Sequence, residues 1–497
     1  MTSGSPFDHD ACMDAERLRA KTLEAYRQGP DAIVALVAGL VAELAGRVTA
    51  LEAENASLRA RLNLTSHNSS KPPSSDGPGS KPQPKSQRTP SGRKSGGQPG
   101  HPGHTLPLVD DPDEVQVHAP THCEGCGRSL ADVAAVRRER RQVMDLPPVK
   151  VQVVEHQAET KRCPGCGTET TGAFPQGVHA PAQYGLGVAT VGAYLNQGQL
   201  LPLERTCETL ADLFGCSLAE GTLERMVGEC HERLAQTEAA IKQGVAEAPV
   251  AHFDETGVRI GGKTRWLHVA STAGLTFYAA HPKRGREGVD AVGVLPAFRG
   301  RAVHDGLTSY WQYAECGHAL CNAHHLRELT VVEEELGQPW AGDLKGLLRE
   351  IKQAVDAARG RGEAALSPEV LGAFRRRYDA ALEAGRAANP PPAPTGQRGR
   401  TKRGKAGSLV ERLRAHQGAV LAFMEDFQAP FDNNQAERDL RMVKVRQKVS
   451  GGFRTQVGAE RFCRIRGYIA TLRKQGESVL SGLGRAITRD SPLPTLA

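Results

Sequence analysis

The sequence predicts a multidomain α+β protein, and three observations support this fold class. The chain has 497 residues, which at ~150 residues per domain suggests about three domains. Two CxxC pairs precede a helical region, and from Ala248 onward β-rich runs alternate with helical segments. We therefore expect an N-terminal helix, a metal-stabilised ribbon, a helical region and an α/β core with mixed strand pairing, in that order.

The basic residues are concentrated at one end of the chain. Lys and Arg total 63 and Asp and Glu total 56, which gives a formal net charge of +7. The segment from Pro430 to the C-terminus has thirteen basic and six acidic residues, so it accounts for the whole excess. A local positive excess of this kind is typical of a surface that meets a polyanion such as nucleic acid.

The N-terminus and the apolar runs argue against secretion and membrane insertion. No basic segment followed by an apolar one is visible at the start of the chain. The longest apolar run, Ile33–Ala45, is shorter than the ~20 residues of a membrane span and contains Glu43. We expect a cytoplasmic protein with no membrane partner, in which the cysteines stay reduced.

Residues 31–64 are predicted to form a coiled-coil helix. Apolar residues recur at two core positions over nearly four heptads, with one Asn in the seam: Val37, Leu44, Leu51 and Leu58 at one, and Val41, Val48, Asn55 and Leu62 at the other. This spacing favours a parallel two-stranded coiled coil in which Asn55 fixes register and partner number. The alternative is an amphipathic helix that packs on its own domain.

Residues 65–112 are predicted to be a disordered, basic linker. Pro, Gly and Ser dominate the segment and apolar residues are nearly absent. Such a composition buries too little surface to offset the entropy of ordering the chain. Its positive charge favours either weak attraction to DNA or a plain solubilising role.

Residues 113–180 are predicted to form a zinc ribbon. Two matched pairs of cysteines, each followed by Gly, supply four thiolates for one closed tetrahedral and therefore structural site: Cys123, Cys126, Cys163 and Cys166. Two matched pairs rarely arise by chance, although four unrelated cysteines are the simpler alternative. Between the pairs, Val149–Glu155 is predicted to be a strand.

Residues 181–246 are predicted to be a helical region that resembles a helix-turn-helix. Helices are expected over Pro202–Phe214 and Ser217–Val227, with Ser217 as the N-cap of the second and Glu220 completing a capping box. The second helix would then enter the major groove. A helical hairpin without DNA contacts is the alternative.

Residues 247–328 are predicted to form the first part of the core. Three antiparallel strands are expected first, with Asp254 near the end of the first and a Gly261–Gly262 hairpin after it. A later strand stops at Asp305, and a short strand then leads into a helix. Because ligands collect at strand ends in α/β sheets, the two carboxylates suggest a site for Mg²⁺.

A third carboxylate is expected from Glu437, on a helix capped by Asp432 or Asn433. Each acid also has a structural alternative: Asp254 could cap a turn, Asp305 could start a β-turn, and Glu437 could pair with Arg441. Glu255 is a weaker alternative to Asp254, since strand alternation points it to the opposite face.

Residues 329–428 are predicted to be a helical insertion with a basic loop over 390–408, and residues 429–497 to complete the core with the third acid and a basic C-terminal tail. The latter segment has a dense basic run near Glu437, predicted to contact DNA phosphates: Arg438, Arg441, Lys444, Arg446, Lys448 and Arg454, followed by Arg461, Arg464 and Arg466. Cys321 and His324 resemble half of a metal site, and we expect them to support the site, contact DNA or pack in the core.

Taken together, these segments resemble the transposases of the insertion sequence 66 family, a bacterial group of DDE recombinases. The matching segments, in order, are NSSKPPSSD (68–76), the two CxxC pairs, AHFDETG (251–257), TRWLHVAST (264–272), HDGLTSY (304–310), LCNAHHLREL (320–329), FDNNQAERDLRMVKVRQKVSGGFR (431–454) and RKQG (473–476).

The resemblance implies an RNase H-like catalytic core with Asp254, Asp305 and Glu437 at the DDE positions. It also places Cys321 and His324 on a C-x2-H motif that some DDE transposases carry. Catalytic Mg²⁺ or Mn²⁺ and structural Zn²⁺ are the expected cofactors. Element ends, target DNA, a second copy of the chain and helper proteins of the same element are the expected partners, in the bacterial cytoplasm near the nucleoid.

Such an enzyme would cut DNA by two-metal hydrolysis and join 3′-hydroxyl ends to target DNA. ATP is not expected, because the chain has no GxxxxGK[ST] motif. Two alternatives stay open: a metal-dependent nuclease without strand transfer, and an inactive zinc-ribbon regulator that only binds DNA.

Overall fold

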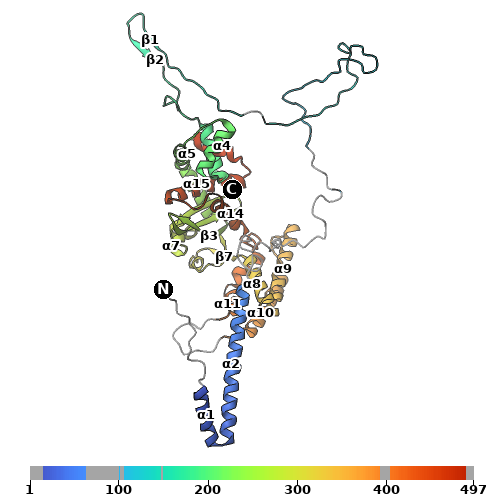
Figure 1. Cartoon of the computed structure of the whole chain (residues 1–497), viewed down its shortest axis with the longest axis vertical. Coiled ribbons are helices and arrows are strands. Elements are labelled where there is room, and N and C mark those ends of the chain that lie inside the picture. The colour runs from blue at the N-terminus through green and yellow to red at the C-terminus, as the bar shows by residue number, and fades with distance from the viewer. Residues whose placement is uncertain (1–14, 63–99, 101–105, 147–148, 392–402, 489–497) are drawn as a thin grey trace. The chain divides into compact units, whose positions relative to one another are not determined.

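The computed structural model describes residues 15–62, 100, 106–146, 149–391 and 403–488 (Figure 1). The chain divides into two compact units. One contains residues 84–181 and 207–218, and the other contains residues 1–83, 182–206 and 219–497. Most of the predicted linker 65–112 and most of the predicted loop 390–408 lie outside the described residues.

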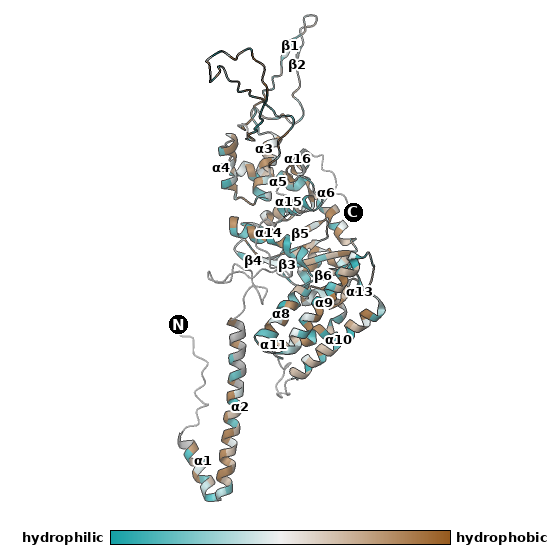
Figure 2. Cartoon of the chain, turned by 90° about the vertical axis from the view of Figure 1, so that its right-hand side faces the viewer, coloured by the Kyte–Doolittle hydropathy of each residue, from teal (hydrophilic) through white to brown (hydrophobic). Residues whose placement is uncertain are grey.

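Two helices precede the linker. The predicted coiled-coil segment is a single helix, α2 (Pro30–Leu62), and a helix that the sequence pattern does not predict, α1 (Ala15–Gln28), packs against it. Gly29 joins them with a φ of +109°, a conformation that favours glycine. Figure 2 shows hydrophobic residues recurring along α2, and the apolar residues of the predicted seam are about half exposed or more.

The same helix is the one described stretch that could cross a membrane by length and composition. The stretch of α2 that meets this test runs from Pro30 to Thr49, and it is longer than the uninterrupted apolar run seen in the sequence. This test is weak support for a membrane segment, because other apolar helices also pass it. The heptad pattern offers another explanation for the same residues.

Each CxxC pair forms a tight turn. At the first, Gly127 N–H donates to Cys123 O at 2.9 Å and Cys123 N–H to Arg128 O at 2.8 Å. At the second, Gly167 and Cys163 repeat this pattern, and the strands β1 (Thr160–Arg162) and β2 (Glu169–Thr171) flank the turn. Gly127 and Gly167 have φ of +71° and +75°, as expected of glycines that close such turns.

The strand predicted over Val149–Glu155 is wrong. Residues 149–155 have no regular secondary structure, and Val153 and Val154 are 87% and 64% exposed. Their β propensity goes unused because none of the described strands pairs with them. Val151 N–H donates instead to Phe214 O, at the end of a helix.

The helical region contains α3 (Leu186–Ala193), a π-helical turn over Tyr194–Gly198, α4 (Leu203–Phe214), α5 (Glu220–Arg233) and α6 (Ala235–Ala246). The predicted helix at 202–214 is confirmed, whereas the predicted capping box is wrong. Helix α5 begins at Glu220 after Ala219, whose side chain cannot cap it, so Ser217 lies before the helix. The helix-turn-helix stays a prediction.

The core sheet has five strands in the order β5-β4-β3-β6-β7. They are β3 (Val250–Ile260), β4 (Lys263–Ser271), β5 (Thr276–His281), β6 (Arg301–His304) and β7 (Gly317–Leu320). The first three pair antiparallel, while β6 runs parallel to both β3 and β7. The predicted mixed pairing and the Gly261–Gly262 hairpin are therefore confirmed.

The two faces of the sheet are covered by different helices. Val258 and Ile260 of β3 pack with residues of α14 (Asn434–Ser450) and α15 (Gln456–Lys474). Ala251 and Phe253 face the other way and pack with residues of α6 and α7 (Arg286–Val292). Alternation along β3 thus decides which side chains share a face with α14.

The insertion between β7 and α14 has a core of its own. It contains α8 (Asn322–Glu334), α9 (Pro339–Gly360), α10 (Pro368–Ala388), α11 (Lys405–Ala415) and two short turns, α12 (Gln417–Val420) and α13 (Ala422–Glu425). Their buried apolar side chains form one cluster. Helix α11 begins at Lys405, so the end of the predicted basic loop, 405–408, is helical.

The last described part of the chain is helical. After α15, α16 (Val479–Thr488) buries Leu483 and Ile487 against its neighbours. The predicted basic tail is therefore helical through Thr488, and residues 489–497 lie outside the described residues.

Helix α15 packs closely on β5 at Gly467. A Cβ atom there would lie 2.9 Å from the backbone oxygen of Thr276. We expect Gly467→Ala to lower the thermal unfolding midpoint, because overpacking costs roughly 1–3 kcal/mol. The matched control is Gly346→Ala in α9, an exposed helical position with open space, where alanine should stabilise by about 0.5–1 kcal/mol. Equal midpoints for the two variants would contradict this account of the packing.

Candidate active site

Asp254 lies in the middle of β3, not near its end as predicted, and Asp305 directly follows the neighbouring parallel strand β6. The ladder between β3 and β6 pairs Val250 with Arg301 and His252 with Val303. Continuing this register by two residues places Asp254 opposite Asp305, which directly follows β6. Alternation also puts both side chains on the face of the sheet that α14 covers.

Glu437 lies in the first turn of α14, the helix that covers this face of the sheet. Ala436 and Leu440 bury the helix against the sheet, which fixes its direction. The turn before the helix is held by Asn433, whose side-chain amide donates to Phe253 O at 2.9 Å and whose Oδ1 lies 2.8 Å from His252 Nδ1. Asn433 is the N-cap residue but makes no side-chain cap bond, and Asp432, one residue earlier, accepts the N–H of Asn434 on Oδ1 at 3.0 Å.

Neighbouring carboxylates act electrostatically on Asp254. The pKa of Asp254 is raised well above its usual value, first by burial, then by the negative charges of Glu255 and Asp305, with a further contribution from Glu437. One backbone N–H, from Glu255, opposes the shift. A cluster of carboxylates in which the pKa of one is raised by the others is typical of a cation-binding site.

Glu255 lies on the opposite face, as strand alternation predicts. Its side chain is 1% exposed and accepts bonds from Arg284 Nε at 2.8 Å and Tyr310 Oη at 2.5 Å. Burial raises its pKa, while the Tyr310 and Arg284 bonds lower it. Both carboxylate oxygens are thus engaged by the protein, which leaves Asp254 as the acid available at the site.

Asp305 begins a turn that two histidines hold. Its Oδ1 accepts Leu307 N–H at 3.0 Å, so the turn expected at this residue is also present. Gly306 N–H donates to His304 Nδ1 at 3.0 Å, and His304 Nε2 lies 3.0 Å from His318 Nδ1. His318 Nε2 in turn lies 3.1 Å from Tyr313 O.

This chain of contacts has one consistent proton assignment. Because Tyr313 O only accepts and Gly306 N–H only donates, both imidazoles are neutral and carry their proton on Nε2. Burial agrees with it, lowering the pKa of His304 to about 3 and also lowering the pKa of His318.

Cys321 and His324 meet Glu437. Cys321 Sγ, a ring nitrogen of His324 and a carboxylate oxygen of Glu437 lie within 4.8 Å of one another. Cys321 is 1% exposed, and Asn433 N–H donates to its sulfur at 3.1 Å. Sequence reasoning singles out both residues but does not connect them with Glu437. The signal available is only their position at the start of the helix after the last strand.

The four cysteines of the predicted zinc ribbon are not gathered. In the part of the chain that the structure describes, the Cys321–His324–Glu437 group is the one set of three or more metal-binding side chains at such distances. The two turns are separately formed and well suited as zinc knuckles. Hydrogen bonds from the turn lower the pKa of Cys123, and a bond with Thr168 lowers the pKa of Cys166, as a thiolate ligand requires.

The basic run near Glu437 divides into exposed and packed residues. Arg438, Arg441, Lys444, Lys448 and Arg454 are exposed to varying degrees. Arg446 instead packs over Phe453, 4.1 Å from the ring centre, and burial lowers its pKa to about 10. The remaining arginines are tied to other elements: Arg461 to Glu224, Arg464 to Glu238 and Arg466 to Gly198 O.

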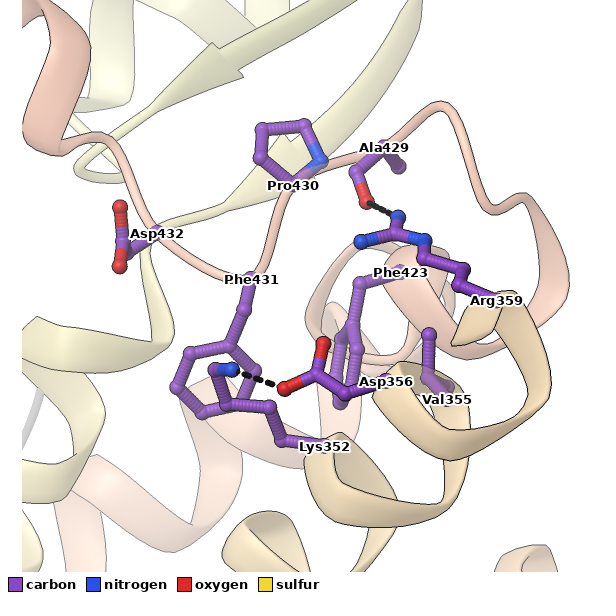
Figure 3. A pocket seen from close by; sticks show the side chains of 9 residues that line it. All are labelled: Lys352, Val355, Asp356, Arg359, Phe423, Ala429, Pro430, Phe431 and Asp432. Carbon is purple, nitrogen blue, oxygen red and sulfur yellow. Dashed lines mark hydrogen bonds and ion pairs between the residues drawn. The ribbon is translucent and has the colours of Figure 1, made fainter. Parts of the chain in front are cut away.

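A cavity lies next to Asp432, in the segment before α14. It has a volume of about 210 Å³ and is lined by α9 and the segment leading to α14, ending at Asp432 (Figure 3). Arg359 donates to Ala429 O at its rim. None of the three acids lines it, so the carboxylates themselves are not enclosed by this cavity.

Comparison with known sequence families gives three matches. Residues 183–461 match the family described as Transposase IS66 family, which covers more than half of the chain. Residues 120–167 match the zinc-finger binding domain of transposase IS66, and residues 21–107 match a family of unknown function. No curated protein matches the chain.

The raised pKa of Asp254 leads to a test of the site in the absence of metal. A carboxyl whose pKa is higher in the folded than in the unfolded state favours folding below that pKa and opposes it once ionised. We expect Asp254→Asn to raise the thermal midpoint at neutral and alkaline pH, because the variant has no buried charge to desolvate. The gain should shrink as the pH falls and the wild-type carboxyl takes up its proton.

Melting curves over a pH series, with and without Mg²⁺, provide the measurement. Mg²⁺ should stabilise the wild type and leave Asp254→Asn unchanged. The control is Asp343→Asn, at an exposed position of α9. An Asp254→Asn variant that is less stable than the wild type at alkaline pH would contradict the electrostatic argument.

Proposed function

Because the chain belongs to the Transposase IS66 family, we propose that it is a DDE transposase that cuts DNA at the ends of its element and joins them to target DNA. The order of the sheet supports an RNase H-like core. It has three antiparallel strands followed by two parallel ones, with an acid on the first strand and another after the fourth. The family membership supports a transposase role, and the two-metal chemistry is proposed on that basis.

The convergence of Asp254, Asp305 and Glu437 carries the proposal. They come from β3, the end of β6 and the start of α14, and two of them raise the pKa of the third. Oxygen ligands of this kind fit Mg²⁺ or Mn²⁺. A pair of such ions, when bound, activates the attacking oxygen and stabilises the leaving oxygen of an in-line displacement at phosphorus.

The protein itself supplies position and charge. Asp254 and Asp305 are held by the sheet register, and Glu437 by Asn433 and the packing of α14. The cations Arg438 and Arg441 follow Glu437 on the same helix and would hold the DNA backbone near the carboxylates. The knuckles would bind a structural Zn²⁺ once the two pairs come together.

The exposed seam of α2 supports a dimer. Its apolar heptad residues are about half exposed or more in one chain, as expected of a helix that pairs with a copy of itself. Two protomers would allow two element ends to be processed together. Helper proteins of the same element remain an expectation from the family resemblance.

The central test is cleavage of DNA that carries the element ends. With Mg²⁺, we expect Asp305→Ala to reduce 3′-end cleavage by a factor of at least about 10³, because removal of a metal ligand removes the charge stabilisation of the transition state. Asp343→Ala should cleave like the wild type. Cleavage and strand-transfer products are measured on the same gel.

The products distinguish the three functions. Cleavage with strand transfer supports the transposase. Cleavage without joining indicates a nuclease, and specific DNA binding without cleavage indicates a regulator. Equal cleavage by Asp305→Ala and the wild type would overturn the assignment of the acids.

The exposed cations are tested by DNA affinity at several salt concentrations. We expect Arg441→Ala with Lys448→Ala to weaken binding and to reduce the salt slope by about 2, since each phosphate contact contributes about 1. Arg349→Ala, at an exposed position of α9, is the control. An unchanged slope in the double variant would exclude these two side chains from the DNA interface.

The dimer is tested by light scattering. We expect Leu44→Asp with Leu51→Asp to give a monomer, because two charges in the seam cannot be buried. Thr49→Asp, outside the two core positions, should keep the wild-type mass. A wild-type monomer, or a dimeric double variant, would contradict the coiled coil.

A further inference from the structure

The group formed by Cys321, His324 and Glu437 has the composition of a metal site of its own. The three side chains come from the end of β7, the first turn of α8 and the first turn of α14. Their ligand atoms already lie within 4.8 Å of one another, so shifts of about an ångström would bring them to the distances of a tetrahedral ion. A fourth position would be left for water.

The donor set differs from that of the acid cluster. Thiolate, imidazole and carboxylate together favour Zn²⁺, whereas three carboxylates favour Mg²⁺. Glu437 belongs to both sets. Glu437 could therefore bind either Mg²⁺ with the two aspartates or Zn²⁺ with Cys321 and His324.

The surroundings of Cys321 act on a thiolate in both directions: burial and the Glu437 carboxylate raise the pKa of the thiol to about 12, while the bond from Asn433 lowers it. The sulfur is buried and accepts Asn433 N–H at 3.1 Å, a bond that a thiolate retains and strengthens. Binding would release the thiol proton to solvent, with the S–H bond replaced by a sulfur–metal bond. The resulting thiolate and the Glu437 carboxylate would balance the two charges of the ion.

One nearby group opposes a cation. Arg327 Nη2 lies 3.8 Å from Glu437 Oε1, the same distance as His324 Nδ1. Its side chain is 18% exposed and would have to turn toward the other carboxylate oxygen or toward solvent. Because Arg327 must move for the ion to bind, we expect a lower affinity for Zn²⁺ than at a closed structural zinc site.

We propose that Cys321, His324 and Glu437 bind Zn²⁺ in preference to Mg²⁺, and that this binding inhibits the enzyme by withdrawing Glu437 from Asp254 and Asp305. The inhibition rests on the proposed function of the three acids. The binding of the ion does not.

Binding is measured on the full chain by equilibrium dialysis against Zn²⁺ and by the thiolate-to-cobalt absorption of the Co²⁺ form. The knuckle cysteines are present in every variant, so differences between variants report the new site alone. We expect the wild type to bind one more Zn²⁺ than Cys321→Ser, with a stronger cobalt–thiolate band. His324→Gln should lose affinity for this ion by at least about tenfold while keeping the buried cysteine.

Cys463→Ser is the matched control, since Cys463 is also a buried cysteine, in α15 and outside the group. It should bind Zn²⁺ and Co²⁺ like the wild type. Equal stoichiometry and equal cobalt spectra for the wild type, Cys321→Ser and His324→Gln would overturn the site.

Inhibition is measured separately, as Mg²⁺-dependent DNA cleavage at increasing Zn²⁺. We expect His324→Gln to need at least about tenfold more Zn²⁺ than the wild type or Cys463→Ser for half-inhibition. An equal Zn²⁺ requirement, despite the extra ion in the wild type, would overturn the inhibitory role. If no variant cleaves DNA, the proposed function fails, while dialysis and absorption still decide whether the site exists.

Discussion

The contacts of Asn433 connect the parts of the candidate site. Its side chain binds Phe253 O and lies against His252, and its backbone N–H donates to Cys321 Sγ. These contacts join β3, the end of β7 and the start of α14, which are separated by up to 181 residues of sequence. Because Asn433 is 1% exposed, loss of its bonds would leave buried polar groups without partners. The position of Glu437 depends on this residue as well as on the packing of α14 against the sheet.

The insertion between β7 and α14 explains why such a connection is needed. Cys321 and Asn433 are 112 residues apart in the sequence, and the helices formed between them bury a cluster of their own. A segment with its own core can rearrange without carrying the sheet along. Local bonds between Asn433, Cys321 and β3 fix the third acid directly to the strands, so its placement does not rely on the path of the insertion.

Much of the sheet could be predicted from the sequence, because alternation, turn residues and strand ends are local signals. The Gly261–Gly262 hairpin, the strand before Asp305 and the short strand before Cys321 all follow from such patterns. Alternation also favours Asp254 over Glu255. The register between β3 and β6, which sets the two aspartates side by side, is a long-range property and could not be deduced from either strand.

The failures have equally physical causes. Val149–Glu155 has the composition of a strand but lacks a partner among the described strands, and Ser217 has the composition of an N-cap but lies too far before the first turn. The role of Arg446 could not be foreseen because a basic residue on a basic helix gives no sign that its guanidinium lies on an aromatic ring. The convergence of Cys321, His324 and Glu437 depends on the tertiary fold alone.

The two histidines behind Asp305 have a final consequence for how protons can move at this edge. Gly306 N–H donates to His304, His304 to His318 and His318 to Tyr313 O, so the one lone pair of each imidazole is occupied. Neither ring can accept a proton without letting go of the loop it supports. The two rings therefore hold the turn in place, and neither would take up a proton released in the proposed reaction.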